Sequence, residues 1–238
     1  MRDVQAYFGD KAHAYRRSAT HGNRDELARM LEWLAPRPGE RALDVATGGG
    51  HTALALAEAG CATVAVDATP AMIRDHPPLP RAVCDAERLP FRRSSFDVVA
   101  SRIAPHHFPD LMLFAQEAAR VLRPQGRLYV FDLTTPADPA QARVIDHVER
   151  LRDPSHGHSW SPEEWRAALD KAGLVVERLV GTSSTFELEL WIARARMPAE
   201  REAELRRILG ARPDLSGYGL VDEGKMRVLR VELLARAG

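Results

Sequence analysis

The chain has 238 residues, of which 45% are hydrophobic and 28% charged, so it is long enough for one α/β domain with a sizeable core. Its 33 basic and 33 acidic residues cancel, and neither half carries a basic block, which argues against a nucleic-acid partner. No run of eighteen apolar residues occurs and the amino terminus is polar and mixed in charge, so we expect neither a membrane span nor a secretory signal.

Two helices are predicted at the amino terminus. Residues 1–20 place aromatic and small apolar side chains, among them Tyr15, at helical spacing, which is typical of an amphipathic helix. Residues 23–35 predict a second helix, because Asn23 is a suitable N-cap and an apolar stripe follows it. Pro36 ends this helix.

Apolar runs alternate with helix-forming segments over the next hundred residues, which indicates a parallel sheet covered on both faces. The predicted strands lie near 41–46, 63–67, 81–84, 97–102 and 127–132, and the predicted helices near 51–59, 70–75 and 110–122. Only thirteen steps separate Met72 from Asp85, and three prolines lie between them. The second helix of the sheet must therefore be unusually short.

The last third of the chain predicts further helices and the end of the sheet. Ser161–Glu164 has capping-box spacing with proline at the first helical position, and Gly173 ends the helix that follows. A strand is expected near 174–180, and residues 186–212 are mostly helical in character. Met226–Ala235 alternates with a period of two, so we expect an antiparallel final strand inserted into the sheet.

The most informative segment is a glycine-rich turn between two acids. Asp44 closes the first predicted strand, Gly48 and Gly50 shape the turn, and Asp67 closes the second strand, which makes a βαβ unit for a nucleoside-sized ligand. Asp44 is placed to accept hydrogen bonds from an ammonium group. Asp67 is placed to accept both hydroxyls of a ribose, although alone it would serve equally well as a helix N-cap. S-adenosylmethionine, with an amino acid at one end and adenosine at the other, fits this pair.

Four ordered pieces of the chain carry a family resemblance. They are Leu43–Gly50, Val64–Met72, Cys84–Phe91 with Phe96–Val99, and Glu117–Leu128. With these pieces the chain resembles the class I S-adenosylmethionine-dependent methyltransferases, and more narrowly the small-molecule branch that includes the ubiquinone and menaquinone C-methyltransferases. The resemblance runs from about Leu27 to Val180 and departs at Ala46 and Gln125, where the family usually has glycine. It implies a Rossmann-like, doubly wound α/β fold: a mostly parallel seven-stranded sheet with an antiparallel last strand and helices on both faces.

The resemblance also implies how S-adenosylmethionine is held as cofactor. The Asp85 carboxylate would accept a hydrogen bond from the adenine amino group, and the Ala86 backbone amide would donate to a ring nitrogen. Met72 would pack on the adenine face, although a plain core role is the alternative. The predicted cofactor contacts are Asp44, Ala46, Thr47, Gly48, Gly50, Asp67, Ala68, Met72, Asp85, Ala86 and Ser101.

Two histidine-containing segments lie where a methyl acceptor would bind. Ser101–Phe108 follows the fourth predicted strand and contains His106 and His107. It lacks the Asn/Asp-Pro-Pro-Tyr loop of methyltransferases that act on amino groups of DNA bases or glutamine, which again argues against nucleic acid. Arg152–Trp160 occupies the loop that we expect between the fifth strand and the next helix, and loops at this edge line the pocket.

Methyl transfer is an in-line displacement at an activated carbon, so the protein mainly aligns the reactants in a dry site. A general base helps only if the nucleophile carries a proton. The candidate bases are His106, His107 and His156, with a structural role expected for at least one of the first two. The predicted acceptor contacts are Tyr15, His21, Arg102, His158 and Trp160. A metal held by His156, His158 and Asp153 with the His106/His107 pair is an alternative, but methyl transfer needs none and we predict none.

The sequence thus predicts a single methyltransferase domain over residues 1–238. Residues 1–35 would form a helical lid, and residues 36–238 an α/β core with a helical insertion near 186–212 that offers a surface for a homodimer. Its acceptor would be a small organic molecule, methylated at carbon, oxygen or nitrogen.

Two other functions stay open. An NAD-linked oxidoreductase shares the architecture, but Ala53 replaces the third glycine of the dinucleotide fingerprint and an acid precedes the turn. A non-catalytic S-adenosylmethionine-binding protein would have no need of the histidines. Cys61 and Cys84 match no zinc spacing and are interpreted as buried thiols of a reducing compartment, which predicts a cytoplasmic protein.

Overall fold

The computed structural model describes residues 22–74, 79–211, 213–222 and 224–238. Their strands form one eight-stranded sheet with the order β3-β2-β1-β4-β5-β8-β6, and β7 pairs with β8 beside this path. The strands are β1 Arg41–Val45, β2 Ala62–Asp67, β3 Arg81–Val83, β4 Phe96–Arg102, β5 Leu122–Leu133, β6 Leu174–Glu187, β7 Gly219–Asp222 and β8 Lys225–Ala237. The first five run parallel, and β8 inserts antiparallel between β5 and β6. The predicted fold class is confirmed, with β7 as an additional strand.

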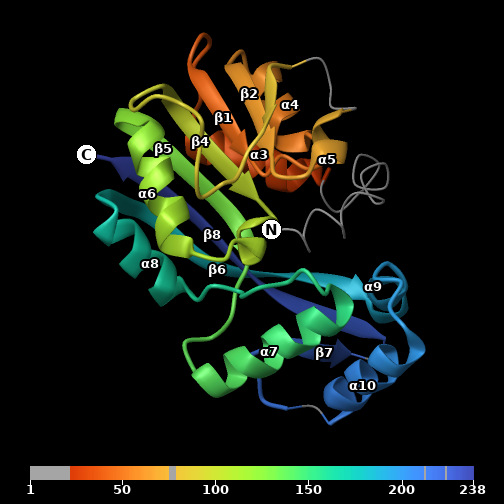
Figure 1. The fold of residues 1–238 in the computed structure, drawn as a ribbon. Coiled ribbons are helices and arrows are strands. Elements are labelled where there is room, and N and C mark those ends of the chain that lie inside the picture. The colour runs from red at the N-terminus through yellow and green to blue at the C-terminus, as the bar shows by residue number, and fades with distance from the viewer. Residues whose placement is uncertain (1–21, 75–78, 212, 223) are drawn as a thin grey trace.

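Helices cover both faces of this sheet (Figure 1). They are α3 Arg24–Leu34, α4 His51–Glu58, α5 Pro70–Arg74, the 3-10 turn η1 Pro105–His107, α6 Leu111–Val121, α7 Pro139–Arg152, α8 Pro162–Lys171, α9 Leu188–Ala193 and α10 Ala199–Gly210. On one face α6 and α8 bury Phe114 and Trp165 completely against the sheet. On the other, Met30 of α3 and Leu56 of α4 pack in a cluster that includes Phe131. The short α5 agrees with the tight spacing before Asp85.

The predicted lid divides into two parts. Residues 1–21, with Tyr15 and His21, lie outside the described residues. The remainder is α3, whose Asn23 side chain accepts hydrogen bonds from the amides of the first turn as an N-cap. Met30 and Leu34 of this helix are fully buried, so α3 is a core helix on one face of the sheet.

One helix that positions the site was not predicted. In the segment that we expected to be loop after the fifth strand, α7 begins at Pro139 with Asp138 as its N-cap. Together with α9, α10 and β7, helix α7 forms a second apolar cluster at one end of the molecule (Figure 1). This cluster includes residues from the last part of β6 and the first part of β8. Strand β6 continues to Glu187, past its predicted end, because it pairs with β8 as far as Lys225. A homodimer through this region stays a prediction.

In the described part of the chain, every helix is too short or too polar to cross a bilayer.

Candidate cofactor and acceptor site

The turn after β1 is anchored by Asp44. Its Oδ2 accepts hydrogen bonds from the Thr47 hydroxyl at 2.5 Å and from the Ala53 amide at 3.0 Å. The carboxyl is 1% exposed, and burial raises its pKa to about 7. Asp44 therefore fixes the start of α4 from inside the turn, and its contact with an ammonium group stays a prediction.

The turn itself uses left-handed backbone. Gly48 has φ 51° and Gly50, the N-cap of α4, has φ 84°. A Cβ placed on Gly48 would meet nothing within 4 Å, so the turn faces open space there. Ala46 and Gln125, the two departures from the family's glycines, also have positive φ, 56° and 65°. The family's preference for glycine at both positions follows from this conformation.

Asp67 closes β2 beside this turn. Its Oδ2 accepts a hydrogen bond from the Gly48 amide at 2.9 Å and its Oδ1 from the Thr69 amide at 2.8 Å. Each oxygen keeps capacity for a second hydrogen bond, which suits two neighbouring hydroxyls. The Thr69 contact also caps the turn before α5, so the two interpretations of Asp67 are compatible. Burial raises the pKa of Asp67.

The predicted adenine edge is largely enclosed by protein. Met72 and Ala86 are 3% and 7% exposed. The Asp85 carboxylate accepts a hydrogen bond from the Glu87 amide at 3.0 Å. Ser101 is fully buried and its hydroxyl donates to the Val45 carbonyl at 3.0 Å, which ties β4 to β1. Ser101 therefore supports the turn by holding the end of β1 against β4.

Where β5 ends, Asp132 holds His106. The His106 Nδ1 lies 2.6 Å from Asp132 Oδ1, and the His106 backbone amide donates to Oδ2 at 2.6 Å. When Asp132 is ionised its carboxylate only accepts, so in that state Nδ1 carries the hydrogen and Nε2 keeps its lone pair. No hydrogen bond engages Nε2 within the described residues. Burial lowers the pKa of His106 to about 3 and raises that of Asp132 to about 7.

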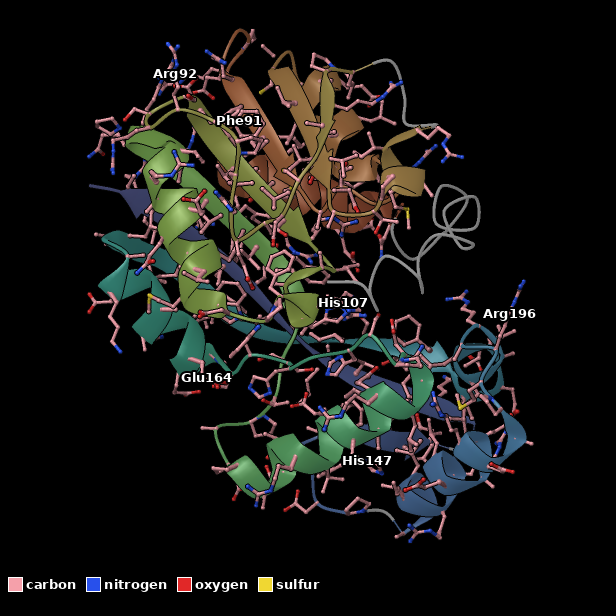
Figure 2. All side chains as sticks on the ribbon, viewed as in Figure 1. Phe91, Arg92, His107, His147, Glu164 and Arg196 are labelled. Atoms are coloured by element: carbon pink, nitrogen blue, oxygen red, sulfur yellow. The ribbon has the colours of Figure 1, made fainter. Side chains whose placement is uncertain are left out.

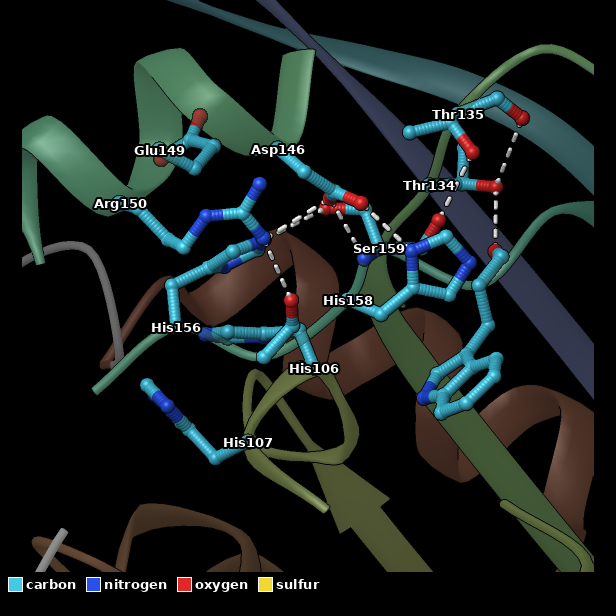
Figure 3. Close-up of polar contacts among 12 residues, drawn as sticks. His106, His107, Thr134, Thr135, Asp146, Glu149, Arg150, His156, His158 and Ser159 are labelled. Carbon is cyan, nitrogen blue, oxygen red and sulfur yellow. Dashed lines mark hydrogen bonds and ion pairs between the residues drawn. The ribbon is translucent and has the colours of Figure 1, made fainter. Parts of the chain in front are cut away.

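His107 and His156 flank the His106 ring (Figure 3). The ring centroids of His107 and His156 lie 4.0 Å and 5.4 Å from that of His106. Nδ1 of His107 donates to the Ser155 carbonyl at 3.0 Å, and burial, with the neighbouring His106, lowers the pKa of His107 to about 3. Figure 2 places His107 at the η1 turn. The three predicted histidines are thus brought together, although they come from two segments: the η1 turn and the loop after α7.

Asp146 of α7 organises the loop that carries His156 and His158. Its Oδ1 contacts Nε2 of His156 at 2.9 Å and accepts from the Ser159 amide at 2.9 Å, while its Oδ2 contacts Nδ1 of His158 at 2.5 Å. His158 Nε2 also lies 3.2 Å from the Glu164 carboxylate at the start of α8. These two carboxylates raise the pKa of His158 to about 9, so this ring is a cation at neutral pH.

The exposure of the histidines separates their roles. The side chain of His156 is 1% exposed, so it has no open face for a substrate. Those of His106 and His107 keep 8% and 11%. His156 supports the loop through Asp146, and its place among the bases stays a prediction.

Two predicted acceptor contacts are engaged within the protein. Trp160 donates its indole N–H to the Pro105 carbonyl at 3.2 Å, which joins the loop to η1. Arg102 forms an ion pair with Glu26 of α3 at 2.6 Å and donates to the Thr52 hydroxyl at 3.2 Å. Both residues therefore connect the elements around His106, and their contacts with an acceptor stay predictions.

Sequence reasoning missed the acids that position the histidines. Asp132 ends β5 and was available by the rule that placed Asp44 and Asp67, an acid that closes a parallel strand. Asp146 lies in a helix that was not predicted, and the N-cap Asp138 with Pro139 was its signal. In the ranges that the structure describes, no group of three or more histidine, cysteine or acidic side chains could hold a metal ion.

Comparison with known proteins identifies the family. A family profile described as "Methyltransferase domain" matches residues 43–130. The uncharacterized methyltransferase YcgJ of Bacillus subtilis is 32% identical over 207 residues, which cover 83% of this chain and 82% of YcgJ. The chain belongs to the class I S-adenosylmethionine-dependent methyltransferases.

The solved structure of a methyltransferase from Bacillus halodurans matches this methyltransferase with a TM-score of 0.82 at 32% identity, over 89% of this chain and 98% of that one. The 27-O-demethylrifamycin SV methyltransferase of Amycolatopsis mediterranei is 33% identical over 219 residues, 86% of this chain and 78% of that relative. S-adenosylmethionine as cofactor and methyl transfer as activity are thereby confirmed, and neither alternative function is favoured.

Proposed function

We propose that this methyltransferase acts on a small organic acceptor whose nucleophile is generated by loss of a proton from an acidic hydroxyl, as in a phenol. The observation that carries the proposal is the His106–Asp132 pair at the carboxyl edge of the sheet, which leaves Nε2 of His106 without a hydrogen bond to any residue that the structure describes. The Amycolatopsis relative, whose name specifies an organic oxygen acceptor, supports a small molecule as substrate.

The cofactor would lie across the ends of β1, β2 and β3. Asp67 would accept the ribose hydroxyls, and the open space beside Gly48 would admit the chain that joins the nucleoside to the amino acid. Bound there, S-adenosylmethionine supplies a methyl group on a positively charged sulfur. The remaining proposed contacts are Asp44, Ala46, Thr47, Gly50, Ala68, Met72, Asp85 and Ala86, with Ser101 as support.

His106 would take the proton of the acceptor hydroxyl at Nε2. Burial lowers the pKa of His106, so the ring is neutral and its lone pair present when the acceptor binds, and transfer of the proton to it depends on the negative charge of Asp132. The Asp132 carboxylate would stabilise the imidazolium that forms and fixes the orientation of the ring. The acceptor oxygen, now an anion, can react directly or pass its electrons to a ring carbon. His107 would line the pocket beside it, and burial of the cluster limits access of water.

A product assay tests this function. We would incubate the protein with S-adenosylmethionine labelled at the methyl group and a panel of phenols, hydroxyquinones and primary amines, and detect labelled products by mass spectrometry. We expect label in hydroxyl-bearing aromatic acceptors and none in amines. An Asp67→Ala variant should abolish labelling at low cofactor concentration. Transfer to amines alone would contradict the proposal, because His106 would then have no acidic hydroxyl to deprotonate.

A further inference from the structure

Among the described residues, Arg230 of β8 is a buried cation without a hydrogen-bond partner. It is 5% exposed, and its Nε and Nη1 atoms are enclosed and unbonded. In the antiparallel register Arg230 lies opposite Leu133, the last residue of β5. The start of β8 therefore reaches the edge of the sheet at which the parallel strands end. The strand partner of Arg230, Leu133, directly follows Asp132 in β5, and the charge of Arg230 lowers the pKa of both Asp132 and His106.

Two neighbouring arginines, unlike Arg230, are paired with carboxylates. Arg29, Arg102 and Arg230 each place the guanidinium carbon 5.9 Å from the centre of the Phe131 ring. Arg29 donates to Glu232 at 2.7 Å, and Arg102 to Glu26 at 2.6 Å. Of these three guanidinium groups around one ring, Arg230 alone has no carboxylate within hydrogen-bond distance.

Three acidic residues interact electrostatically with Arg230 but form their hydrogen bonds with other residues. They are Asp132, Glu149 and Glu26. Asp132 holds His106, Glu26 holds Arg102, and Glu149 accepts from Arg152 at 2.8 Å and from the Tyr218 hydroxyl at 2.9 Å. Arg230 is thus the surplus cation of the cluster, and its buried donors are left for another acceptor.

Buried donors of a charged group are costly to leave unbonded, and such groups in folded proteins mark places where a ligand or water completes the bonding. A guanidinium remains charged in proteins and offers paired N–H groups that match an oxyanion. We propose that Arg230 binds an anionic oxygen of the methyl acceptor: either a carboxylate carried beside the reacting hydroxyl, or the phenolate oxygen that remains once His106 has taken the hydroxyl proton. The inference rests on the acceptor site proposed above. It adds that the molecule bound there carries a negative charge.

Binding in the absence of turnover tests this proposal. With the protein saturated by S-adenosylhomocysteine, calorimetry would compare benzoate with benzamide, and 4-nitrophenolate with 4-nitroanisole. We expect at least one anion to bind at least tenfold more tightly than its neutral analogue. A preference for benzoate would identify the anionic group as a carboxylate, and a preference for 4-nitrophenolate would identify it as a phenolate. In Arg230→Met this preference should disappear. Arg236→Met is the matched control, because Arg236 lies on the same strand in an exposed ion pair with Glu177; it should keep the preference.

Thermal unfolding of the same variants separates binding from support of the fold. Because Arg230 makes no hydrogen bond, Arg230→Met should unfold at the wild-type temperature or above. If Arg230→Met does not fold, Arg230→Gln takes its place in the binding assay. Equal affinity for charged and neutral probes, binding of neither anion, or a charge preference that survives the loss of Arg230 would each overturn the proposal. Failure of the product assay would leave this anion preference measurable, so the two proposals fail separately.

Discussion

The two halves of the site are held in place in different ways. In the cofactor half, Asp44 and Asp67 are fixed mainly by backbone amides of their own βαβ unit, all within residues 44–69. In the histidine half, His106 depends on Asp132 of β5, and His158 depends on Asp146 of α7 and Glu164 of α8. One half rests mainly on backbone amides. The other is assembled mainly from contacts between side chains of different elements.

This difference predicts how each half responds to mutation. A carboxylate held by loop amides can be removed with a loss of ligand affinity and little change elsewhere. A carboxylate that holds several side chains should, when removed, disturb all of them at once. Four substitutions test this contrast.

Removal of Asp146 should have the largest effect. Asp146→Ala deletes the acceptor of His156, His158 and the Ser159 amide at a position 4% exposed. We expect a loss of about 3–5 kcal/mol in the free energy of unfolding, because the buried His156 ring, the buried Ser159 amide and the protonated His158 all lose their acceptor. Urea denaturation measures it. Asp170→Ala, on the exposed face of α8, is the control and should change stability by less than about 0.5 kcal/mol. A loss below about 1 kcal/mol for Asp146→Ala would mean that the loop with His156 and His158 keeps its conformation without Asp146.

Removal of the proposed base should stop chemistry without loosening the cofactor. His106→Gln should lower kcat by roughly 10²–10⁴-fold, the usual contribution of a general base, with the affinity for S-adenosylhomocysteine unchanged. His147→Gln, at an exposed ion pair of α7 with Glu204, should leave both unchanged. Single-turnover rates and calorimetry provide the two readouts. An unaltered rate in His106→Gln would show that the acceptor reaches the site already deprotonated.

The cofactor half should show the reverse pattern. Asp67→Ala should weaken S-adenosylhomocysteine binding by about 10²-fold, since hydrogen bonds to a charged group contribute about 1.5–3 kcal/mol each. Its unfolding temperature without ligand should stay close to that of the wild type. Asp97→Ala is the control at the opposite edge of the sheet, where Asp97 pairs with Arg123. Equal affinities for Asp67→Ala and the wild type would remove Asp67 from the cofactor site.

The same division explains how much could be predicted from the sequence. The β1 turn, α4 and β2 were located to within a residue or two, because a glycine turn between two apolar runs is a contiguous signal. The antiparallel insertion of β8 was also predicted, from its alternating pattern and the family resemblance. These features depend on neighbours in the chain.

The partners of the histidines could not be predicted in this way. His106 was placed correctly at the edge of the sheet, but its bond to Asp132 joins residues 26 positions apart. The same holds for Arg230, whose charge reaches His106 only when β8 inserts beside β5. Side-chain pairs across strands follow from register and twist, which a single sequence leaves open.

The smallest expected effect is a pH-dependent one. Hydrogen bonds to Asp146 and Glu164 raise the pKa of His158 to about 9, against an ordinary value of 6.5. A histidine whose pKa is raised on folding stabilises the folded state fully below its unfolded pKa, and that contribution is lost as the pH rises through the folded pKa. His158→Gln should therefore be less stable than the wild type near pH 6, by on the order of 1–2 kcal/mol after allowance for solvent screening of this partly exposed pair.

The difference between the two proteins should shrink as the pH rises from about 7 to about 10, because the wild type loses the proton that His158→Gln never carries. Urea denaturation at intervals across this range measures it, with His147→Gln as the exposed control. A difference that does not change with pH would mean that His158 acts through its shape and neutral hydrogen bonds. The histidine half would then be held by packing, and its contrast with the amide-bound cofactor half would not be electrostatic in origin.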